Sequence, residues 1–285
     1  MNYKTISELI SRSAINVDKP SGITSRQVVS EIKEILKCKK AGHTGVLDPR
    51  VTGVLVVALD NATKVMPVLM GLDKEYEGIM YLHKDVDRKK LEKVISKYFV
   101  GEITQTPPVK SRVARKPRKR KVYFFDIIEK DGKNVKFRTK VQAGTYIRKL
   151  CSDIGGKLGI GAHMKELRRT SVGHFKIKDS HTLEKIKQKS KNEKFLRKIL
   201  IPIEKTIPHV KRVYVKDTSI KSILNGSPVF TSDIVNIQSG IKTRETVGIF
   251  SLKEKLIALG ISKVDSKFML KERKKSVIRT DRILT

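Results

Sequence analysis

The chain has 285 residues, enough for one large domain or two ordinary domains, each with its own hydrophobic core. Its 62 Lys and Arg residues outnumber 29 Asp and Glu residues and leave a formal net charge of +33, so the surface is expected to bind a polyanion, with nucleic acid as the first candidate. No apolar run reaches the roughly 18 residues of a membrane-spanning helix, and residues 1–15 lack the apolar centre of a signal peptide, which argues against a membrane protein and predicts an intracellular location.

The first clear helix signal is a capping box at residues 24–27, where Thr24 is the expected cap and Gln27 its partner. Apolar residues follow at helical spacing as far as Leu36, and a Lys-rich turn at residues 37–40 ends the helix. After a Gly-containing loop, the short apolar run 54–59 predicts a buried strand.

Two further segments, 77–82 and 135–141, are predicted strands, and the second alternates apolar with basic residues as in a sheet with one solvated face. Thr145 is predicted to cap a second helix with an apolar stripe between Ile147 and Leu158, which leaves Arg148 away from the centre of that stripe.

The composition becomes polar and basic at residues 188–198, and Pro202 and Pro208 follow, so a domain boundary is predicted there. Beyond it, short strands alternate with turns at Asn225-Gly226 and Ser239-Gly240, a pattern typical of a small β-barrel. The predicted strands are 213–215, 234–237, 247–250 and 256–259.

The two cysteines, Cys38 and Cys151, lie far apart and have no second Cys or His at metal-ligand spacing. Neither a disulfide framework nor a metal site is therefore predicted, and both thiols are expected to be small core residues.

The loop 41–49 places a histidine and an acid among glycines just before the predicted buried strand. From residue types alone, the simpler hypothesis makes Asp48-Pro49 a turn starter and His43 a hydrogen-bonded loop histidine. A functional loop held by rigid elements is the alternative.

Resemblance to a known family favours the functional alternative. Together with Asp18–Gly22, the segment Gly42–Pro49 closely resembles the active-site loop and the preceding motif of the TruB/dyskerin family of pseudouridine synthases. Further matches follow in family order at Lys74–Tyr76, Gly101–Ile103 with Pro107-Pro108, Ala143–Arg148 and Gly161–Thr170. The resemblance covers roughly residues 14 to 200 and implies an α+β fold, in which a mixed, mainly antiparallel sheet is flanked by helices, for a catalytic domain at 15–200.

The family reaction detaches uracil from ribose, rotates it and rejoins it through C5, so the resemblance implies an enzyme that needs no cofactor and no metal. It makes Asp48 the catalytic carboxylate, acting either as a nucleophile or as a base toward a ribose proton. Arg148 corresponds to the family's partner arginine, which favours the ionised carboxylate through a charge-assisted hydrogen bond. A surface helix arginine is the alternative for Arg148.

Tyr76 matches the tyrosine that stacks on the target base, and stacking is the safer role because a phenol of ordinary pKa near 10 is a weak base. By the same resemblance Tyr146 and Leu167 shape the uridine pocket, although core packing is an alternative for Leu167. His43 corresponds to a residue that helps to hold RNA with the target nucleotide out of its stack.

Residues 110–121 carry eight basic residues in twelve and no acid. A disordered or localisation tract is one interpretation, and a folded strip that contacts the RNA backbone is the preferred one because the tract lies inside the catalytic domain. The predicted RNA contacts are Lys19, Lys110, Arg112, Arg115, Lys116, Arg118, Lys119, Arg120, Arg168 and Arg169.

Residues 207–285 resemble a PUA domain, the small RNA-binding β-barrel fused to these synthases, and residues 1–14 are expected to pack on it. The resemblance rests on Val215–Thr218, Ile223–Pro228, Gly240–Lys242 and Val247–Phe250. The stretch Phe230–Asp233 departs from the apolar, Pro-containing turn that the resemblance implies there.

The sequences of residues 105–111 and 161–170 more closely resemble the dyskerin branch. The interval between Tyr76 and Gly101 is too short for the RNA-binding insertion of stand-alone enzymes. This branch implies a box H/ACA guide RNA, a substrate RNA that is ribosomal or transfer RNA, and small H/ACA accessory proteins as partners. It also implies a cytoplasmic location in an archaeon and a nucleolar one in a eukaryote. A stand-alone transfer-RNA enzyme and a non-catalytic RNA-particle scaffold are the alternatives.

Overall fold

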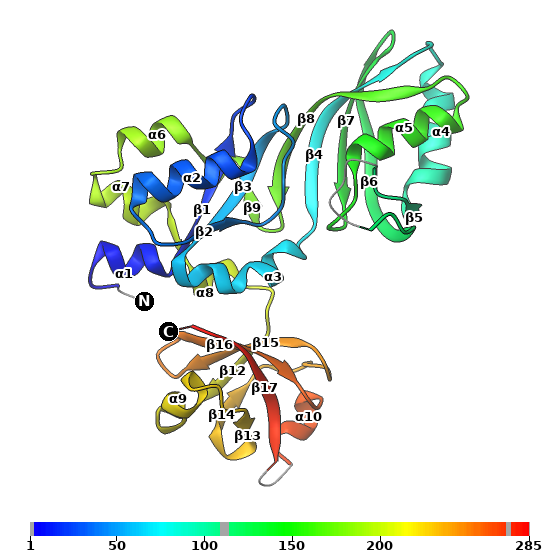
Figure 1. The fold of residues 1–285 in the computed structure, drawn as a ribbon. Helices are drawn as coiled ribbons and strands as arrows, with labels where there is room; N and C mark the ends of the chain where they lie inside the picture. The colour runs from blue at the N-terminus through cyan, green and yellow to red at the C-terminus, as the bar shows by residue number, and fades with distance from the viewer. Residues whose placement is uncertain (1–2, 109–113, 272–274, 285) are drawn as a thin grey trace.

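A mixed sheet of eleven strands forms the centre of the first domain in the computed structural model, which describes residues 3–108, 114–271 and 275–284 (Figure 1). The main path runs β10-β1-β3-β8-β4-β7-β6-β5, with β11 on β1, β2 on β3 and β9 on β8. Within the described residues the neighbours are antiparallel, apart from β1 with β10 and β3 with β8. The strands are β1 Ser13–Lys19, β2 Ala41–His43, β3 Thr52–Leu59, β4 Lys74–Leu82, β5 Gly101–Gln105, β6 Arg118–Asp131, β7 Asn134–Val141, β8 Ala162–Val172, β9 Phe175–Lys176, β10 His181–Thr182 and β11 Leu200–Pro202.

Helices cover the two halves of this sheet as separate groups (Figure 1). One apolar core lies beneath α4 and α5, and a second lies beneath α1, α2, α6 and α7. The helices are α1 Ile6–Ser11, α2 Ser25–Leu36, α3 Met66–Met70, α4 Arg88–Phe99, α5 Ile147–Lys157, α6 Leu183–Gln188, α7 Glu193–Ile199 and α8 Ile203–Thr206, with 3-10 turns η1 Asp60–Val65 and η2 Ile177–Asp179. The predicted fold class is confirmed.

The predicted helix at residues 24–36 is confirmed as α2, and its capping box is present. The Thr24 hydroxyl accepts the Gln27 N–H at 3.2 Å, and the Gln27 side chain accepts the Thr24 N–H at 2.7 Å. The helix ends at Lys37, whose φ of 52° is left-handed.

The predicted cap of α5 is wrong by one residue. Tyr146 is the residue at the cap position, and it makes no side-chain capping bond. The Thr145 hydroxyl donates instead to the Gln142 carbonyl at 2.8 Å, because Thr145 belongs to the turn that leads into the helix.

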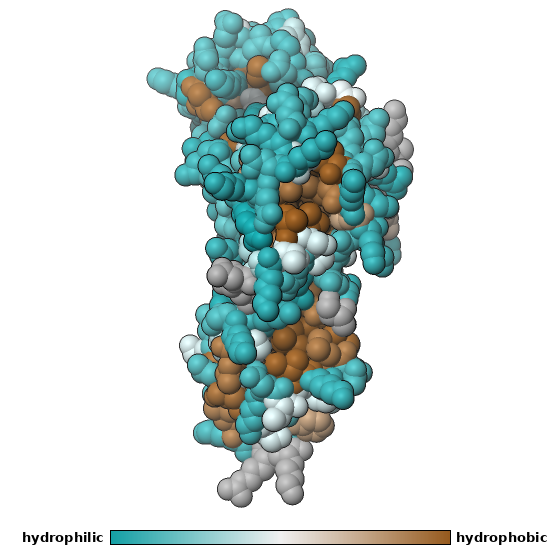
Figure 2. All heavy atoms as spheres, turned by 90° about the vertical axis from the view of Figure 1, so that its left-hand side faces the viewer, coloured by the Kyte–Doolittle hydropathy of each residue, from teal (hydrophilic) through white to brown (hydrophobic). Residues whose placement is uncertain are grey.

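A six-stranded sheet, in the order β13-β17-β16-β15-β12-β14, forms the second domain and confirms the predicted small barrel. Its elements are β12 Arg212–Val215, α9 Asp217–Leu224, β13 Val229–Phe230, η3 Thr231–Asp233, β14 Ile234–Ile237, β15 Thr246–Ser251, β16 Leu256–Ser262, α10 Ser266–Met269 and β17 Ser276–Ile283. Figure 2 views the left-hand side of Figure 1 and shows a mostly hydrophilic surface with more than one hydrophobic area on each domain. No described helix is long and apolar enough to cross a membrane.

The two domains share an apolar core at their junction, which contains residues from β3 and η1 together with Phe250, Leu256 and Leu284 of the second domain. Beside this core, the buried Arg12 side chain donates to the carbonyls of Leu256 at 2.7 Å and Leu284 at 3.3 Å. It also lies 3.4 Å from the Glu204 carboxylate.

The N-terminal extension therefore has two kinds of contact. Tyr3 and Leu9 belong to the core beneath α2, α6 and α7, so the extension packs largely on the first domain. Arg12 carries its contact to the second domain. The expectation that residues 1–14 pack on the PUA-like domain thus describes Arg12 but not the helix α1.

Tyr3 gives the junction a predictable pH dependence. Its hydroxyl donates to Glu204 at 3.0 Å, and burial together with the Glu204 charge raises the pKa of Tyr3 to about 12. The folded-state pKa of Tyr3 lies above the unfolded value near 10, so the buried neutral phenol stabilises the folded protein fully below pH 10. That contribution is lost between about pH 10 and 12. Urea unfolding should show that wild type loses roughly 2 kcal/mol relative to Tyr3→Phe over this range. Parallel pH profiles for the two proteins would contradict the raised pKa of Tyr3.

Candidate active site

The loop that carries Asp48 connects β2 to β3 and is fixed by main-chain hydrogen bonds. The buried Ser25 hydroxyl, at the start of α2, accepts a hydrogen bond from the Leu47 N–H at 2.8 Å and donates one to the Leu47 carbonyl at 3.1 Å. On the other side of Asp48, the Val51 N–H donates to the Asp48 carbonyl at 3.0 Å. The residue before Asp48 and the turn after it are therefore both held.

Asp48 pairs with Arg148, as the resemblance implies. Two nitrogens of one guanidinium face the two carboxylate oxygens, with Nε 3.1 Å from Oδ2 and Nη2 3.4 Å from Oδ1. Both side chains remain about half exposed. The two-point contact fixes the orientation of the carboxylate and leaves it open to a substrate.

Lys19 and Arg169 were expected to contact RNA, and the structure places both inside the protein. The Lys19 ammonium is fully buried and donates to the carbonyls of Pro20, Ile23 and Pro49 at 2.7, 2.7 and 2.9 Å. Arg169 is 1% exposed and donates to Val54 at 2.7 Å and Gly45 at 3.2 Å. That expectation is corrected, because their donors bind the main chain on both sides of Asp48.

These buried cations have consequences for their surroundings. Burial lowers the pKa of Lys19, while the nearby Asp48 charge acts in the opposite direction. Gly53, which pairs with Arg169 across β3 and β8, has a φ of +104°, and a Cβ there would collide with the Arg169 main chain. Only glycine permits this approach of the two strands.

The aromatic and apolar candidates lie beside the loop. Tyr76 on β4 is 8% exposed and belongs to the same core as Leu47 and Val51, which flank Asp48 in sequence. Leu167 on β8 packs partly buried against this core, opposite Gly78 of β4. Leu167 therefore packs on the core, as the core-packing alternative expects, and the exposed part of its side chain stays a candidate for the uridine pocket.

His43 forms part of the loop itself. Its Nδ1 accepts the Gly45 N–H at 3.3 Å. Burial, and next the Arg169 guanidinium, lowers the pKa of His43, so the imidazole is neutral at pH 7. In the protein without RNA, His43 is therefore a neutral ring and not a cation.

Gln105 is a positioning residue that the sequence did not indicate. Its buried side chain on β5 accepts the Tyr146 N–H at 3.0 Å and donates to the Tyr146 carbonyl at 3.3 Å. These two hydrogen bonds to the Tyr146 main chain fix the start of α5, two residues before Arg148. Because the partners are 41 residues apart, no local pattern could have revealed the contact.

The basic tract is only partly described. Lys110 and Arg112 lie outside the described residues, whereas Arg115, Lys116 and Lys119 are exposed, and Lys119 pairs with Glu102 at 2.9 Å. Arg118 and Arg120 on β6 line a small cavity of about 120 Å³ together with Gln105, Pro107, Gly144 and Tyr146. The structure thus brings two of the predicted arginines to Tyr146.

Arg168 differs from its neighbour Arg169 because successive strand residues face opposite sides. Its guanidinium is 2.7 Å from the Asp18 carboxylate and 3.2 Å from the Thr52 hydroxyl, and the side chain is 42% exposed. Among the described residues, no group of three or more His, Cys, Asp or Glu side chains is placed to hold a metal ion.

Comparison with known families divides the chain into three matches. Residues 33–147 match the TruB family pseudouridylate synthase N-terminal domain, and residues 148–207 match the tRNA pseudouridylate synthase B C-terminal domain. Residues 211–284 match the PUA domain.

Individual proteins agree with these matches. The chain is 45% identical to a probable tRNA pseudouridine synthase B of Nanoarchaeum equitans, over 98% of this chain and 82% of that protein, and 44% identical to the protein of the same name in Methanopyrus kandleri, over 99% and 85%. It superimposes on a chain in the crystal structure of a Cbf5-Nop10-Gar1 complex with a TM-score of 0.92 and 41% identity, covering 99% of this chain and 88% of that one. A structure of an archaeal box H/ACA Nop10-Cbf5 complex gives a TM-score of 0.90 at 39% identity, with 99% and 89% covered.

The fold, the Asp48 loop and these matches define an RNA pseudouridine synthase, an enzyme that isomerises uridine within RNA. The chain belongs to the TruB family of pseudouridylate synthases.

The buried position of Lys19 can be tested against an exposed neighbour. Lys19→Met leaves three carbonyls without their donor and should lower the free energy of unfolding by about 2–4 kcal/mol. Arg168→Met, which removes a partly exposed ion pair, should change it by less than about 1 kcal/mol. Urea unfolding measures both. Undiminished stability of Lys19→Met combined with weaker RNA binding would restore the RNA-contact interpretation.

Proposed function

We propose that this synthase is the catalytic subunit of a box H/ACA ribonucleoprotein, with ribosomal RNA as its main substrate and transfer RNA as a further one. The observation that carries the proposal is the superposition over both domains on chains from complexes whose titles name Cbf5 with Nop10 and Gar1. A third similar structure, with a TM-score of 0.88, is titled as an H/ACA RNP bound to a substrate RNA that contains 2′-deoxyuridine. The proposed partners are accordingly a guide RNA, a substrate RNA and small accessory proteins.

The connection between β4 and β5 supports this proposal. Residues 83–100 consist of a short turn, the twelve-residue helix α4 and one residue before β5. This leaves no room for a separate RNA-gripping insertion, so a substrate has to be held by other components. A guide RNA supplies that function by base pairing.

The site suggests a division of labour for the isomerisation. Asp48 supplies the carboxylate that acts on the nucleotide, as a nucleophile or as a base, and Arg148 orients it through two hydrogen bonds. Tyr76 and Leu167 present an apolar wall against which a flipped uracil stacks. Tyr146, held by Gln105, borders this pocket, and His43 contacts the RNA beside it.

Basic side chains that are exposed or half-buried are proposed to bind the RNA backbone. The exposed ones are Arg115, Lys116 and Lys119, the half-buried ones are Arg118, Arg120 and Arg168, and each phosphate that they neutralise releases counterions. Since the organisms named for the relatives are archaea, the proposed location is the archaeal cytoplasm.

A stand-alone transfer-RNA enzyme is the second candidate, and the names of the relatives favour it. The two candidates differ in what the protein needs in order to act. They share the same catalytic residues, so mutation of the pocket cannot separate them.

Asp48→Asn tests the proposed carboxylate. The amide keeps the shape of the side chain but is neither a nucleophile nor a base, so tritium release from RNA labelled at uridine C5 should fall by about 10³-fold or more. Asp153→Asn, on the helix that carries Arg148, is the matched control and should retain activity. RNA affinity in a filter-binding assay should stay within about twofold for both variants, because neither residue is placed on the basic surface. Activity retained by Asp48→Asn would reject the carboxylate mechanism.

Dependence on a guide separates the two candidate functions. The protein is assayed alone with transfer RNA, and then with archaeal Nop10, Gar1, an H/ACA guide and a target strand that matches the guide. We expect modification of the target only when the guide pairs with it, and slow or no modification by the protein alone. Efficient modification of transfer RNA by the isolated protein would favour the stand-alone enzyme.

A further inference from the structure

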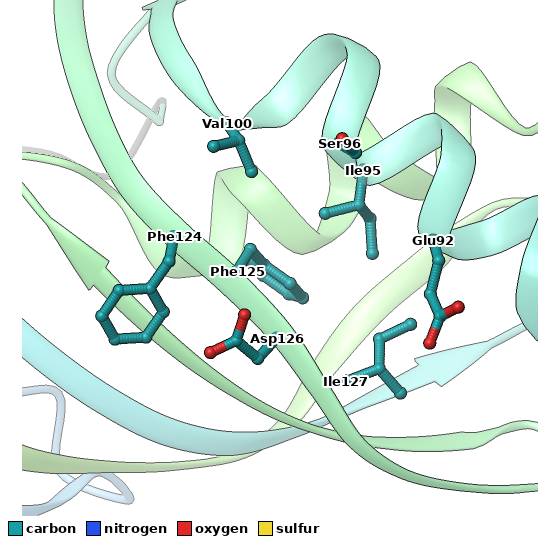
Figure 3. A pocket seen from close by; sticks show the side chains of 8 residues that line it. All are labelled: Glu92, Ile95, Ser96, Val100, Phe124, Phe125, Asp126 and Ile127. Carbon is teal, nitrogen blue, oxygen red and sulfur yellow. The ribbon is translucent and has the colours of Figure 1, made fainter.

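A groove with a volume of about 390 Å³ lies between α4 and β6, apart from the Asp48 loop (Figure 3). Its apolar lining comes from Ile95 and Val100 on the helix side and from Phe124, Phe125 and Ile127 on the strand, with Glu92, Ser96 and Asp126 as the polar residues. Figure 3 shows Phe125 and Ile127 pointing from β6 toward α4, and Phe124 pointing away.

Four successive residues of β6, from Phe124 to Ile127, line this one groove. Side chains of a strand alternate between its two faces, so a groove on one face would be lined by every second residue. A groove lined by all four runs along the edge of the strand. What it exposes is therefore the main chain of β6 as well as its side chains.

The pairing of the sheet explains why this edge is open. The β5 strand begins at Gly101, opposite Val122, and covers only residues 118–122 of β6. Beyond Val122, β6 continues for nine residues to Asp131 and is paired with β7 on its other side. At the far end of the groove, Arg88 of α4 donates to the Ile127 carbonyl at 2.9 Å. The stretch between Val122 and Ile127 is thus a strand edge next to an apolar groove.

The groove is lined by two ionisable side chains, both acidic, and each of them has an arginine nearby. Its lining contains two carboxylates, Glu92 and Asp126, and no Lys or Arg, although basic residues outnumber acidic ones 62 to 29 in the sequence. Glu92 forms an ion pair with Arg88, with Nε 2.7 Å from Oε1. Asp126 is exposed, and its neighbour across the strand pair is Arg138. An RNA backbone would bring phosphates against these acids, and a second copy of the chain would bring the same acids against each other. A protein segment with a basic side chain fits the groove.

We propose that this groove is the docking site for an extended segment of a partner protein, which adds a strand to the free edge of β6. The main chain of the segment pairs with β6 between Tyr123 and Asp126, before the Ile127 carbonyl that Arg88 binds, as in other cases of strand addition. Alternate apolar side chains enter the groove between Ile95 and Phe125, and a Lys or Arg lies beside Asp126. The proposal is independent of which RNA the active site modifies.

Selection from a library of displayed ten-residue peptides tests the groove. Wild-type protein is the target, and peptides that also bind Ser96→Trp are removed, because an indole on the exposed Ser96 fills the groove without disturbing the core. We expect enriched peptides that alternate apolar residues and carry at least one Lys or Arg. By fluorescence anisotropy, Ser96→Trp should weaken a selected peptide by about tenfold or more. Lys93→Trp, exposed on the same helix but outside the groove, should leave its affinity within about twofold.

Two further measurements identify the mode of binding. A selected peptide that is N-methylated at alternate residues should lose affinity, and hydrogen exchange should show protection of β6 amides between Tyr123 and Asp126 when the unmethylated peptide binds. Asp126→Asn should weaken a peptide that contains Lys by about threefold or more, and should leave its Lys→Gln counterpart unchanged.

The contrary outcomes are equally definite. No enrichment over the Ser96→Trp protein, unaltered affinity of the methylated peptide, or competition by RNA for the groove would overturn the proposal. Concentration-dependent dimers of wild type that disappear in Ser96→Trp would assign the groove to a second copy and overturn it as well.

Discussion

The position of Asp48, the proposed catalytic carboxylate, depends on two buried positive charges, Lys19 and Arg169, which form no ion pair with an acid among the described residues. Arg169 ties the first half of the Asp48 loop to β3 through Gly45 and Val54, and Lys19 ties the second half to α2 and β1 through Pro49 and Ile23. Removing a cation from water is costly, and main-chain carbonyls offset the cost only if they all converge on it. The loop therefore has one arrangement in which both cations are satisfied.

This arrangement fixes several neighbouring features. Because Arg169 lies in β8 next to β3, the two strands must approach closely at Gly53, where no side chain fits. The neighbouring Arg168 then has to face the other side, where Asp18 and Thr52 receive it. One arginine of this adjacent pair thus lies in the interior and the other reaches the surface, and both lie on β8, which is next to β3 in the main path of the sheet.

Local patterns predicted the elements whose signal is contained within a few residues. The capping box of α2, the buried strand β3 and the Gly turns of the barrel are of this kind, and the ordered motifs pointed to Asp48 and Arg148. Gln105 could not be predicted, because its role depends on Tyr146, which is distant in sequence. The prediction of RNA contacts is wrong for Lys19 and Arg169 because basic residues are mostly exposed, whereas these two are buried and donate to main-chain carbonyls. Recognising residues 162–172 as a strand would have sent Arg168 and Arg169 to opposite faces.

The core shared by the two domains has a mechanical consequence. Phe250, Leu256 and Leu284 of the barrel pack with residues of β3 and η1. Beside them, Arg12 contacts the Glu204 carboxylate and the main chain of Leu256 and Leu284. A hinge at this place would have to expose the apolar side chains of a close-packed interior, which is costly. The barrel and the first domain therefore keep one relative orientation. An RNA that contacted the barrel and the Asp48 loop together would have to fit the spacing between them, because the junction could not adjust to a longer or shorter molecule.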